Sequence, residues 1–112
     1  MTMSTHQPIL TTSITATAGL NRFQFVGFDG GVCAAGAKAL GVAETSAGVG
    51  EQAPVNLLGS ILVMAGAPIK VEAEVQSDAA GQAIPKTDGA SNGYALDAAT
   101  AAGDVIRILR GI

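Results

Sequence analysis

Residues 54–64 read PVNLLGSILVM. Apolar residues that favour β-structure lie on both sides of Gly59. A glycine inside a strand marks a bulge or a sharp bend, because it has no side chain to pack and adopts conformations that other residues avoid. The segment therefore predicts two short strands with a bend at Gly59, or a single strand with a bulge there.

Five further segments combine β-favouring residues or alternation with turn signals nearby. They are residues 10–17, 22–26, 40–43, 69–76 and 104–110. Alternation places Phe23 and Phe25 on one face of their segment, and Val71 and Val75 on one face of theirs. Three aromatic side chains are expected in the core: Phe23, Phe25 and Tyr94.

Dipeptides typical of tight turns separate these segments. They include Asp29-Gly30, Asp88-Gly89 and Asn92-Gly93. Short strands between glycine-rich turns are typical of β-barrels and sandwiches, and not of parallel α/β sheets. The sequence therefore predicts an all-β fold. We expect a small single-domain β-barrel or sandwich with short strands at residues 10–112, preceded by an extended N-terminal arm at residues 1–9.

Two stretches of the chain resemble each other. Residues 41–55 read GVAETSAGVGEQAPV, and residues 93–108 read GYALDAATAAGDVIRI. Each predicts a short strand, a loop of small residues, a glycine followed by an acidic residue, and a second strand. The glycine supplies the positive φ that redirects the chain. We interpret the similarity as structural, without a catalytic role.

The 112-residue chain has a formal net charge of −3, a pI near 4.8 and only 13% charged residues. Without a basic run it lacks the footprint of a nucleic-acid-binding protein. No window reaches the ~18 apolar residues of a membrane span, and the N-terminus has no secretory signal. A single cysteine excludes an internal disulfide and favours a cytoplasmic origin. A chain this poor in charge indicates that neighbouring molecules cover much of its surface.

Residue types that support catalysis are scarce. The single histidine, His6, lies near the terminus, where it is not held within hydrogen-bond reach of Cys33 as a general base. One cysteine and one histidine do not supply a metal site, and no phosphate-binding glycine motif is present. The aspartates stand beside turns, where their side chains bond the local backbone. We therefore expect no enzymatic activity, metal, cofactor or small-molecule substrate.

The C-terminal stretch GYALDAATAAGDVIRILRG, residues 93–111, is similar to the closing signature of capsid cement proteins of tailed bacteriophages, also called head decoration proteins. Residues 35–59 resemble the Leu-Gly-Val-Ala element of this family and the turn that follows it. Residues 71–85 resemble its middle strand and its Ser-Asp-Ala-Ala-Gly turn. The resemblance covers about residues 36–111, in the same order.

The resemblance implies a structural virion protein with a β-barrel-like fold, usually a homotrimer. It implies binding to the outer surface of an icosahedral capsid at local threefold positions. The partner would be the major capsid protein, whose neighbouring subunits are bridged after head expansion, and synthesis would take place in the host cytoplasm. No catalytic residues are implied. A small β-barrel adaptor module that binds protein or sugar is the alternative.

The resemblance also implies an N-terminal arm that reaches the capsid lattice, which fits residues 1–9. If such an arm adds a strand to a capsid sheet edge, main-chain hydrogen bonds supply affinity and side-chain pockets set the register. We expect Pro8, Ile9 and Leu10 to be the anchors of this capsid-binding arm. Thr5 and Gln7 would give polar support.

Overall fold

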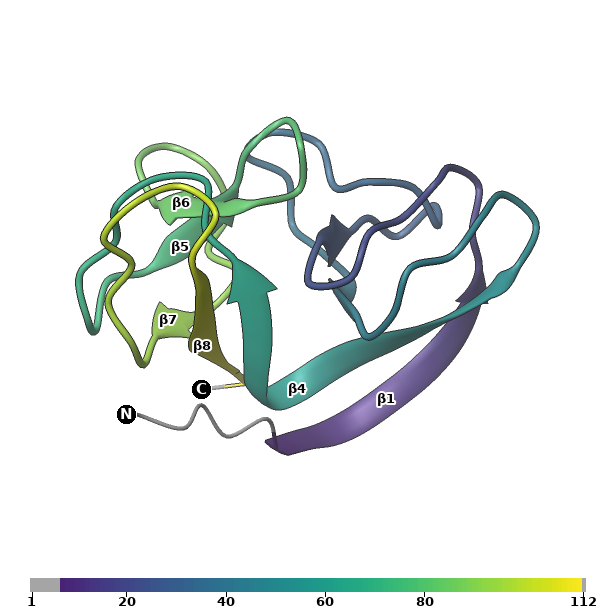
Figure 1. Cartoon of the computed structure of the whole chain (residues 1–112), viewed down its shortest axis with the longest axis horizontal. Coiled ribbons are helices and arrows are strands. Elements are labelled where there is room, and N and C mark those ends of the chain that lie inside the picture. The colour runs from purple at the N-terminus through teal and green to yellow at the C-terminus, as the bar shows by residue number, and fades with distance from the viewer. Residues whose placement is uncertain (1–6, 112) are drawn as a thin grey trace.

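The computed structural model describes residues 7–111, which form an all-β structure without a helix (Figure 1). The strands are β1 (Gln7–Thr15), β2 (Phe25–Val26), β3 (Gly41–Ala43), β4 (Gln52–Met64), β5 (Val75–Ser77), β6 (Ala83–Pro85), β7 (Tyr94–Ala95) and β8 (Val105–Arg110). One sheet has the order β2-β3-β4-β8-β7 with β1 beside β4, while β5 and β6 form a second sheet. The larger sheet curls into a half-barrel within a single compact domain, which confirms the predicted fold class.

The 13-residue strand β4 bends sharply (Figure 1). Gly59 lies in its middle, with a φ of 107° that favours glycine. A Cβ here would lie 2.6 Å from the carbonyl oxygen of Gln7 and 2.8 Å from the amide nitrogen of Ile9. The pairing with β1 shifts register at the same place, on both sides of Leu10. Of the two alternatives that the sequence leaves open, the single bulged strand is correct.

β4 has different partners in its two halves. In the N-terminal half it pairs with β1 on one edge and β3 on the other, so that Asn56 faces both Thr11 and Val42. In the C-terminal half, from Gly59 onward, it pairs with β8. The strand is therefore shared by the two halves of the molecule.

The two halves are structural repeats. We define residues 10–55 as repeat A and residues 59–108 as repeat B. In repeat A, the backbones of Leu20 and Ala47 exchange two hydrogen bonds, of 2.9 and 3.0 Å. In repeat B, those of Ile69 and Ala99 exchange two hydrogen bonds of 2.9 Å. The same bridge thus closes the same loop in each repeat.

The equivalence extends along most of each repeat. The Ala16 N–H donates to the Glu51 carbonyl oxygen in repeat A, and the Ala65 N–H donates to the Asp104 carbonyl oxygen in repeat B. The glycines that precede these two acidic residues, Gly50 and Gly103, both have positive φ, 84° and 95°. The similarity between residues 41–55 and residues 93–108 is therefore one part of a longer repeat.

Two clusters of buried apolar residues form the core. The cluster of repeat A contains Ala16, Leu20, Val26, Ala43, Ala47, Ala53 and Val55. The larger cluster is built around residues of repeat B, among them Ile61, Val63, Val75, Ile106 and Ile108. It also takes in Phe25 from repeat A, the largest of the fully buried side chains. Repeat A therefore packs onto repeat B through Phe25 together with Cys33, Ala39 and Val42, and the predicted core position of Phe25 is confirmed.

Left-handed backbone at two equivalent positions overturns two predicted strands. Phe23 has a φ of 67° and Glu72 a φ of 74°, so neither residues 22–26 nor residues 69–76 form one alternating strand. The Phe23 N–H donates to the Ala43 carbonyl oxygen, and the Glu72 N–H donates to the Ala95 carbonyl oxygen. These long-range bonds impose a turn that local alternation does not reveal.

Two residues predicted for the core, Phe23 and Tyr94, are not fully buried, and neither is Val71. Phe23 is only half-buried, with the Arg22 guanidinium carbon 4.4 Å from the centre of its ring. Val71, which the alternation places beside Val75, is exposed. Tyr94 is also exposed, at the edge of the sheet in β7.

Candidate functional site

β1 is an uncharged strand at the edge of the sheet. Its sequence is QPILTTSIT, and none of its nine residues is buried. One edge pairs with β4, and no other strand among residues 7–111 pairs with the opposite edge. Exposed edges usually carry charges or are covered, because an open ladder of N–H and C=O groups can pair with another chain. β1 therefore has the properties of an interaction surface.

The backbone hydrogen bonds tell which groups of β1 face outward. The Ala16 N–H donates to Glu51, just beyond the end of the strand. Because bonded and non-bonded pairs alternate along an antiparallel ladder, the backbone groups of Thr11, Ser13 and Thr15 point away from β4. We name this row the outer edge of β1.

The N-terminal end of β1 is apolar. Ile9 is 82% exposed and Leu10 is 47% exposed. Leu10 lies opposite Leu58 of β4, which is also exposed. The next residue, Thr11, donates from its hydroxyl to Oδ1 of the buried Asn56 at 2.7 Å. An apolar patch of Ile9, Leu10 and Leu58 thus adjoins the outer edge.

The strand begins earlier than the sequence suggests. Residues 7–9 of the expected arm lie in β1 and pair with β4, instead of preceding the first strand. Of the five residues expected to bind the capsid, Gln7, Pro8, Ile9 and Leu10 are therefore strand residues. Thr5 and His6 lie outside the described residues. The register shift opposite Gly59 accommodates this longer strand, and sequence alone does not reveal where pairing starts.

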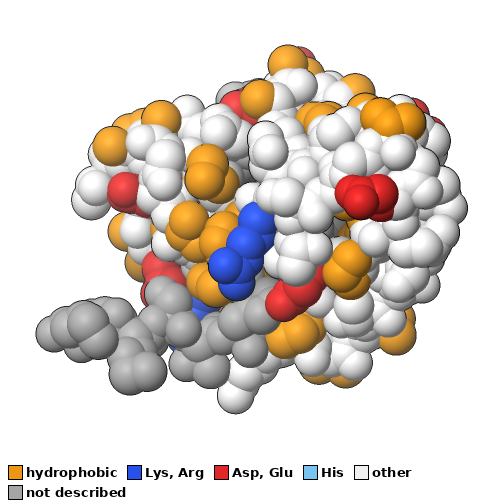
Figure 2. Space-filling model, turned by 45° about the vertical axis from the view of Figure 1, so that its right-hand side comes forward, with side chains coloured by type: hydrophobic (Ala, Val, Ile, Leu, Met, Phe, Trp, Pro, Cys, Tyr) orange, Lys and Arg blue, Asp and Glu red, His pale blue; other side chains and the backbone are white. Residues whose placement is uncertain are grey.

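Charged side chains are sparse on the face that Figure 2 shows, where hydrophobic side chains form small scattered groups. Several of the acidic groups bind turns of the protein itself. Asp29 accepts the N–H of Gly31, and Asp78 accepts that of Gln82, as expected for aspartates beside turns. Hydrogen bonds from the Thr100 N–H and hydroxyl, and from the Ala101 N–H, lower the pKa of Asp104.

One aspartate has an additional role that the turn interpretation does not predict. Asp97 binds the Arg107 guanidinium with both carboxylate oxygens, at 2.8 and 2.9 Å. Hydrogen bonds from Arg107 lower the pKa of Asp97. The pair links the loop after β7 to β8 and is part of the framework of repeat B.

The described residues hold little reactive chemistry. Cys33 is buried, and burial raises the pKa of its thiol, which disfavours the nucleophilic thiolate. Within residues 7–111, histidine, cysteine and acidic side chains form no group of three suited to a metal ion. The same residues include no helix long and apolar enough to span a bilayer.

The fold and this surface define a small all-β protein with an open strand edge and few reactive groups among residues 7–111. Residues 3–110 match the family model described as phage cement protein, and the chain belongs to that family. The family match confirms the resemblance found in residues 36–111 and extends it to almost the whole chain. The protein is therefore a structural protein of the phage capsid.

A solved structure has the same fold. The structure described as the head fiber gp8.5 N base in bacteriophage phi29 matches with a TM-score of 0.72 and 23% sequence identity. The match covers 89% of this chain and 92% of that chain. No curated protein matches the sequence.

Proposed function

We propose that this protein is a trimeric cement subunit on the outside of an icosahedral phage head. Each trimer sits at a local threefold position and bridges subunits of the major capsid protein after the head has expanded. Membership of the phage cement protein family supports the capsid as the partner. The near absence of reactive groups among residues 7–111 supports a role that depends on buried surface.

The observation that carries this proposal is the uncharged outer edge of β1 next to the patch of Ile9, Leu10 and Leu58. A shell subunit that pairs with this edge gains main-chain hydrogen bonds, and the apolar patch sets the register. Pro8, Ile9 and Leu10 are the anchors of the contact, and Gln7 and Thr5 support it. The capsid-binding segment therefore continues from the N-terminal arm into β1.

Three linked contacts explain how weak individual contacts hold a shell together. After one subunit of a trimer has bound, the other two act at high effective concentration. Packaged DNA pushes the shell outward, and each trimer adds buried area across joints that would otherwise resist this pressure alone. The clamp needs no reaction and no cofactor.

The test is binding of purified protein to expanded heads that lack it. The variant carries Ile9→Asp and Leu10→Asp, which places charge in the patch where both side chains are already exposed. We expect its affinity for heads to fall by about 2 kcal/mol or more per contact, with an unchanged circular dichroism spectrum. Val49→Asp is the matched control, because Val49 is 71% exposed at a distant loop.

Saturation of the heads by the double variant at wild-type concentration would contradict the proposed contact. Electron microscopy of decorated heads checks the position, and density away from the local threefold axes would contradict that part. Sedimentation at micromolar concentration checks the trimer. A stable wild-type monomer would contradict a trimer formed before binding.

A further inference from the structure

Phe28 is an aromatic side chain that the fold leaves in solvent. It is 71% exposed and lies outside both core clusters. A phenyl ring exposed to solvent forgoes the favourable free energy of burying its apolar surface. Aromatic side chains of this kind are typical anchors of protein interfaces.

The turn that carries Phe28, residues 27–31, is held rigidly. The Gly27 N–H donates to the Gly31 carbonyl oxygen at 2.8 Å, and the Gly31 N–H donates to Oδ1 of Asp29 at 3.0 Å. Thr17 fastens the turn from outside: its N–H donates to the Gly30 carbonyl oxygen at 3.0 Å, and its hydroxyl donates to the Asp29 carbonyl oxygen at 3.1 Å. The ring is thus presented on a preorganised support, which lowers the entropy lost on binding.

Repeat B shows that this turn does not need an aromatic residue. Residues 78–82 form the equivalent turn, where the Asp78 N–H donates to Gln82 and the Gly81 N–H donates back to Asp78. Ala79 occupies the position that corresponds to Phe28. Because the same turn forms with alanine, the phenyl ring has a role outside the turn.

Repeat B carries a complementary feature, an apolar pocket of about 350 Å³. Its lining consists of Pro68, Ile69, Lys70, Ala73, Pro85 and Ala99. The lysine is the one charged residue of this lining, and the acidic residue next to Phe28 is the exposed Asp29. The turn therefore pairs a ring with a negative charge, and the pocket pairs an apolar surface with a positive charge.

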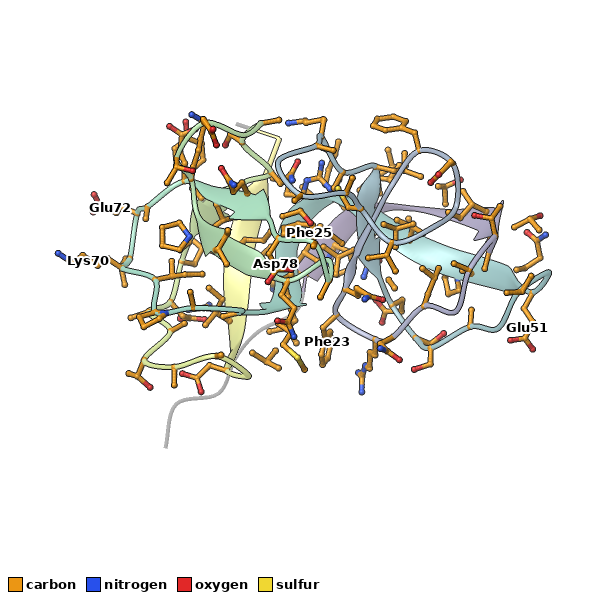
Figure 3. The ribbon with its side chains drawn as sticks, turned by 90° about the horizontal axis from the view of Figure 1, so that it is seen from above. Phe23, Phe25, Glu51, Lys70, Glu72 and Asp78 are labelled. Carbon is orange, nitrogen blue, oxygen red and sulfur yellow. The ribbon has the colours of Figure 1, made fainter. Side chains whose placement is uncertain are left out.

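The two features lie on different repeats, the Phe28 side chain on repeat A and the pocket on repeat B. Thr17, which fastens the Phe28 turn, follows directly on Ala16, whose N–H bonds Glu51. Figure 3 shows Glu51 at one end of the long axis and Lys70, at the pocket, at the other end. Phe28 does not line the pocket of its own chain, and a second copy can bring the side chain and the pocket together.

We infer that Phe28 of one copy enters the apolar pocket of the next copy, with Asp29 opposite Lys70. The contact is head-to-tail. In a closed cyclic oligomer, every Phe28 side chain therefore fills a pocket and every pocket is filled. The inference rests on the proposed function for the number of copies, and it names the surface through which they associate. It requires neither Thr11 nor Ser13 of the outer edge of β1, which stay available to the shell.

The first test is sedimentation velocity of Phe28→Ala at micromolar concentration. We expect its self-association to weaken by about tenfold or more, while the thermal unfolding midpoint stays close to that of the wild type. Val49→Ala is the matched control, since Val49 has the same exposed fraction of 71% on another loop of repeat A. This control should assemble like the wild type.

A second variant tests the pocket. Ala73 is half-buried and lines it, so that Ala73→Leu fills the pocket and should weaken self-association as Phe28→Ala does. Phe28→Ala keeps an intact pocket and Ala73→Leu keeps an intact ring. A mixture of the two should therefore form heterodimers through one good contact, but no closed ring.

The outcomes separate this inference from the proposed function. If Phe28→Ala assembles like the wild type, or if the wild type is a monomer that still decorates heads, the head-to-tail contact is wrong and capsid binding stands. If the wild type assembles through Phe28 but does not bind heads, the contact stands and the cement role is wrong.

Discussion

Repeats A and B have the same backbone hydrogen-bond scheme, but their first strands differ in burial. In repeat B this strand is the C-terminal half of β4, where Ile61 and Val63 are fully buried. In repeat A it is β1, which has no buried residue. Equivalent strands can thus be interior or exposed, depending on what packs against them.

Residues of repeat A pack against the first strand of repeat B, the C-terminal half of β4. The Met64 N–H donates to the Phe23 carbonyl oxygen at 2.9 Å, and Phe25 lies in the same cluster as Ile61 and Val63. Thr15 is the repeat A equivalent of Met64, and its carbonyl oxygen lies against Gly30. From Gln7 to Ser13, β1 lacks the packing partner that its counterpart has, and another molecule can supply one.

The largest expected effect comes from breaking the strand that the repeats share. Gly59→Ala should lower the free energy of unfolding by about 3 kcal/mol or more, because a Cβ there collides with the backbone of β1 and the φ is unfavourable. Gly50→Ala, with positive φ but no atom within 4 Å, should cost only about 1–2 kcal/mol. Urea unfolding measures both. Equal losses would show that close packing at Gly59 contributes nothing.

The difference in burial between the first strands predicts unequal effects of truncation at equivalent positions. Val63→Ala, in the interior, should cost about 2–3 kcal/mol of unfolding free energy. Ile14→Ala should cost about 1 kcal/mol although it removes more atoms, because Ile14 is only partly buried at the rim of its cluster. A loss for Ile14→Ala larger than that for Val63→Ala would mean that another copy of the protein packs on β1 in solution. The unfolding free energy would then depend on protein concentration.

The smallest effect concerns an ion pair that repeat A does not share. Thr45 and Pro54 occupy the positions of Asp97 and Arg107. Asp97→Asn should cost about 1 kcal/mol at neutral pH, and Thr45→Ala at most about 0.5 kcal/mol.

The effect of Asp97→Asn should depend on pH. The Arg107 hydrogen bonds lower the pKa of Asp97 in the folded protein. The stability that the carboxylate contributes is therefore present above its unfolded pKa of about 3.9, and it is lost as the pH falls through the folded value. In urea unfolding, the gap between wild type and Asp97→Asn should shrink below about pH 4. If this difference in unfolding free energy did not change with pH, the stability lost in Asp97→Asn would come from packing and not from the charge.

Local signals predicted much of the fold. Runs of β-favouring residues located β3, β4 and β8, and the glycine-acid pairs marked turns, because strand preference and positive φ act within a few residues. Alternation failed at Phe23 and Glu72. The bonds that turn the chain there come from Ala43 and Ala95, which lie far away in the sequence.

The residues of the proposed capsid-binding segment have a sequence signal only in part. Ile9 and Leu10 stood out as apolar residues near a polar terminus, and both are exposed. The outer edge of β1 did not stand out, because an edge strand and a central strand have the same local preferences. The sequence does not predict the exposure of Phe28 either, because a single exposed aromatic residue in a turn leaves no periodic pattern.

The sequence by itself determined an all-β chain with little charge, repeated glycine-acid turns and a bend at Gly59, because these properties depend on residue type and near neighbours. Only the tertiary structure decided which of two equivalent strands became interior and which remained open. Burial depends on the elements that pack from elsewhere in the chain. Phe25 and other repeat A residues pack against the first strand of repeat B, whereas β1 has no buried residue.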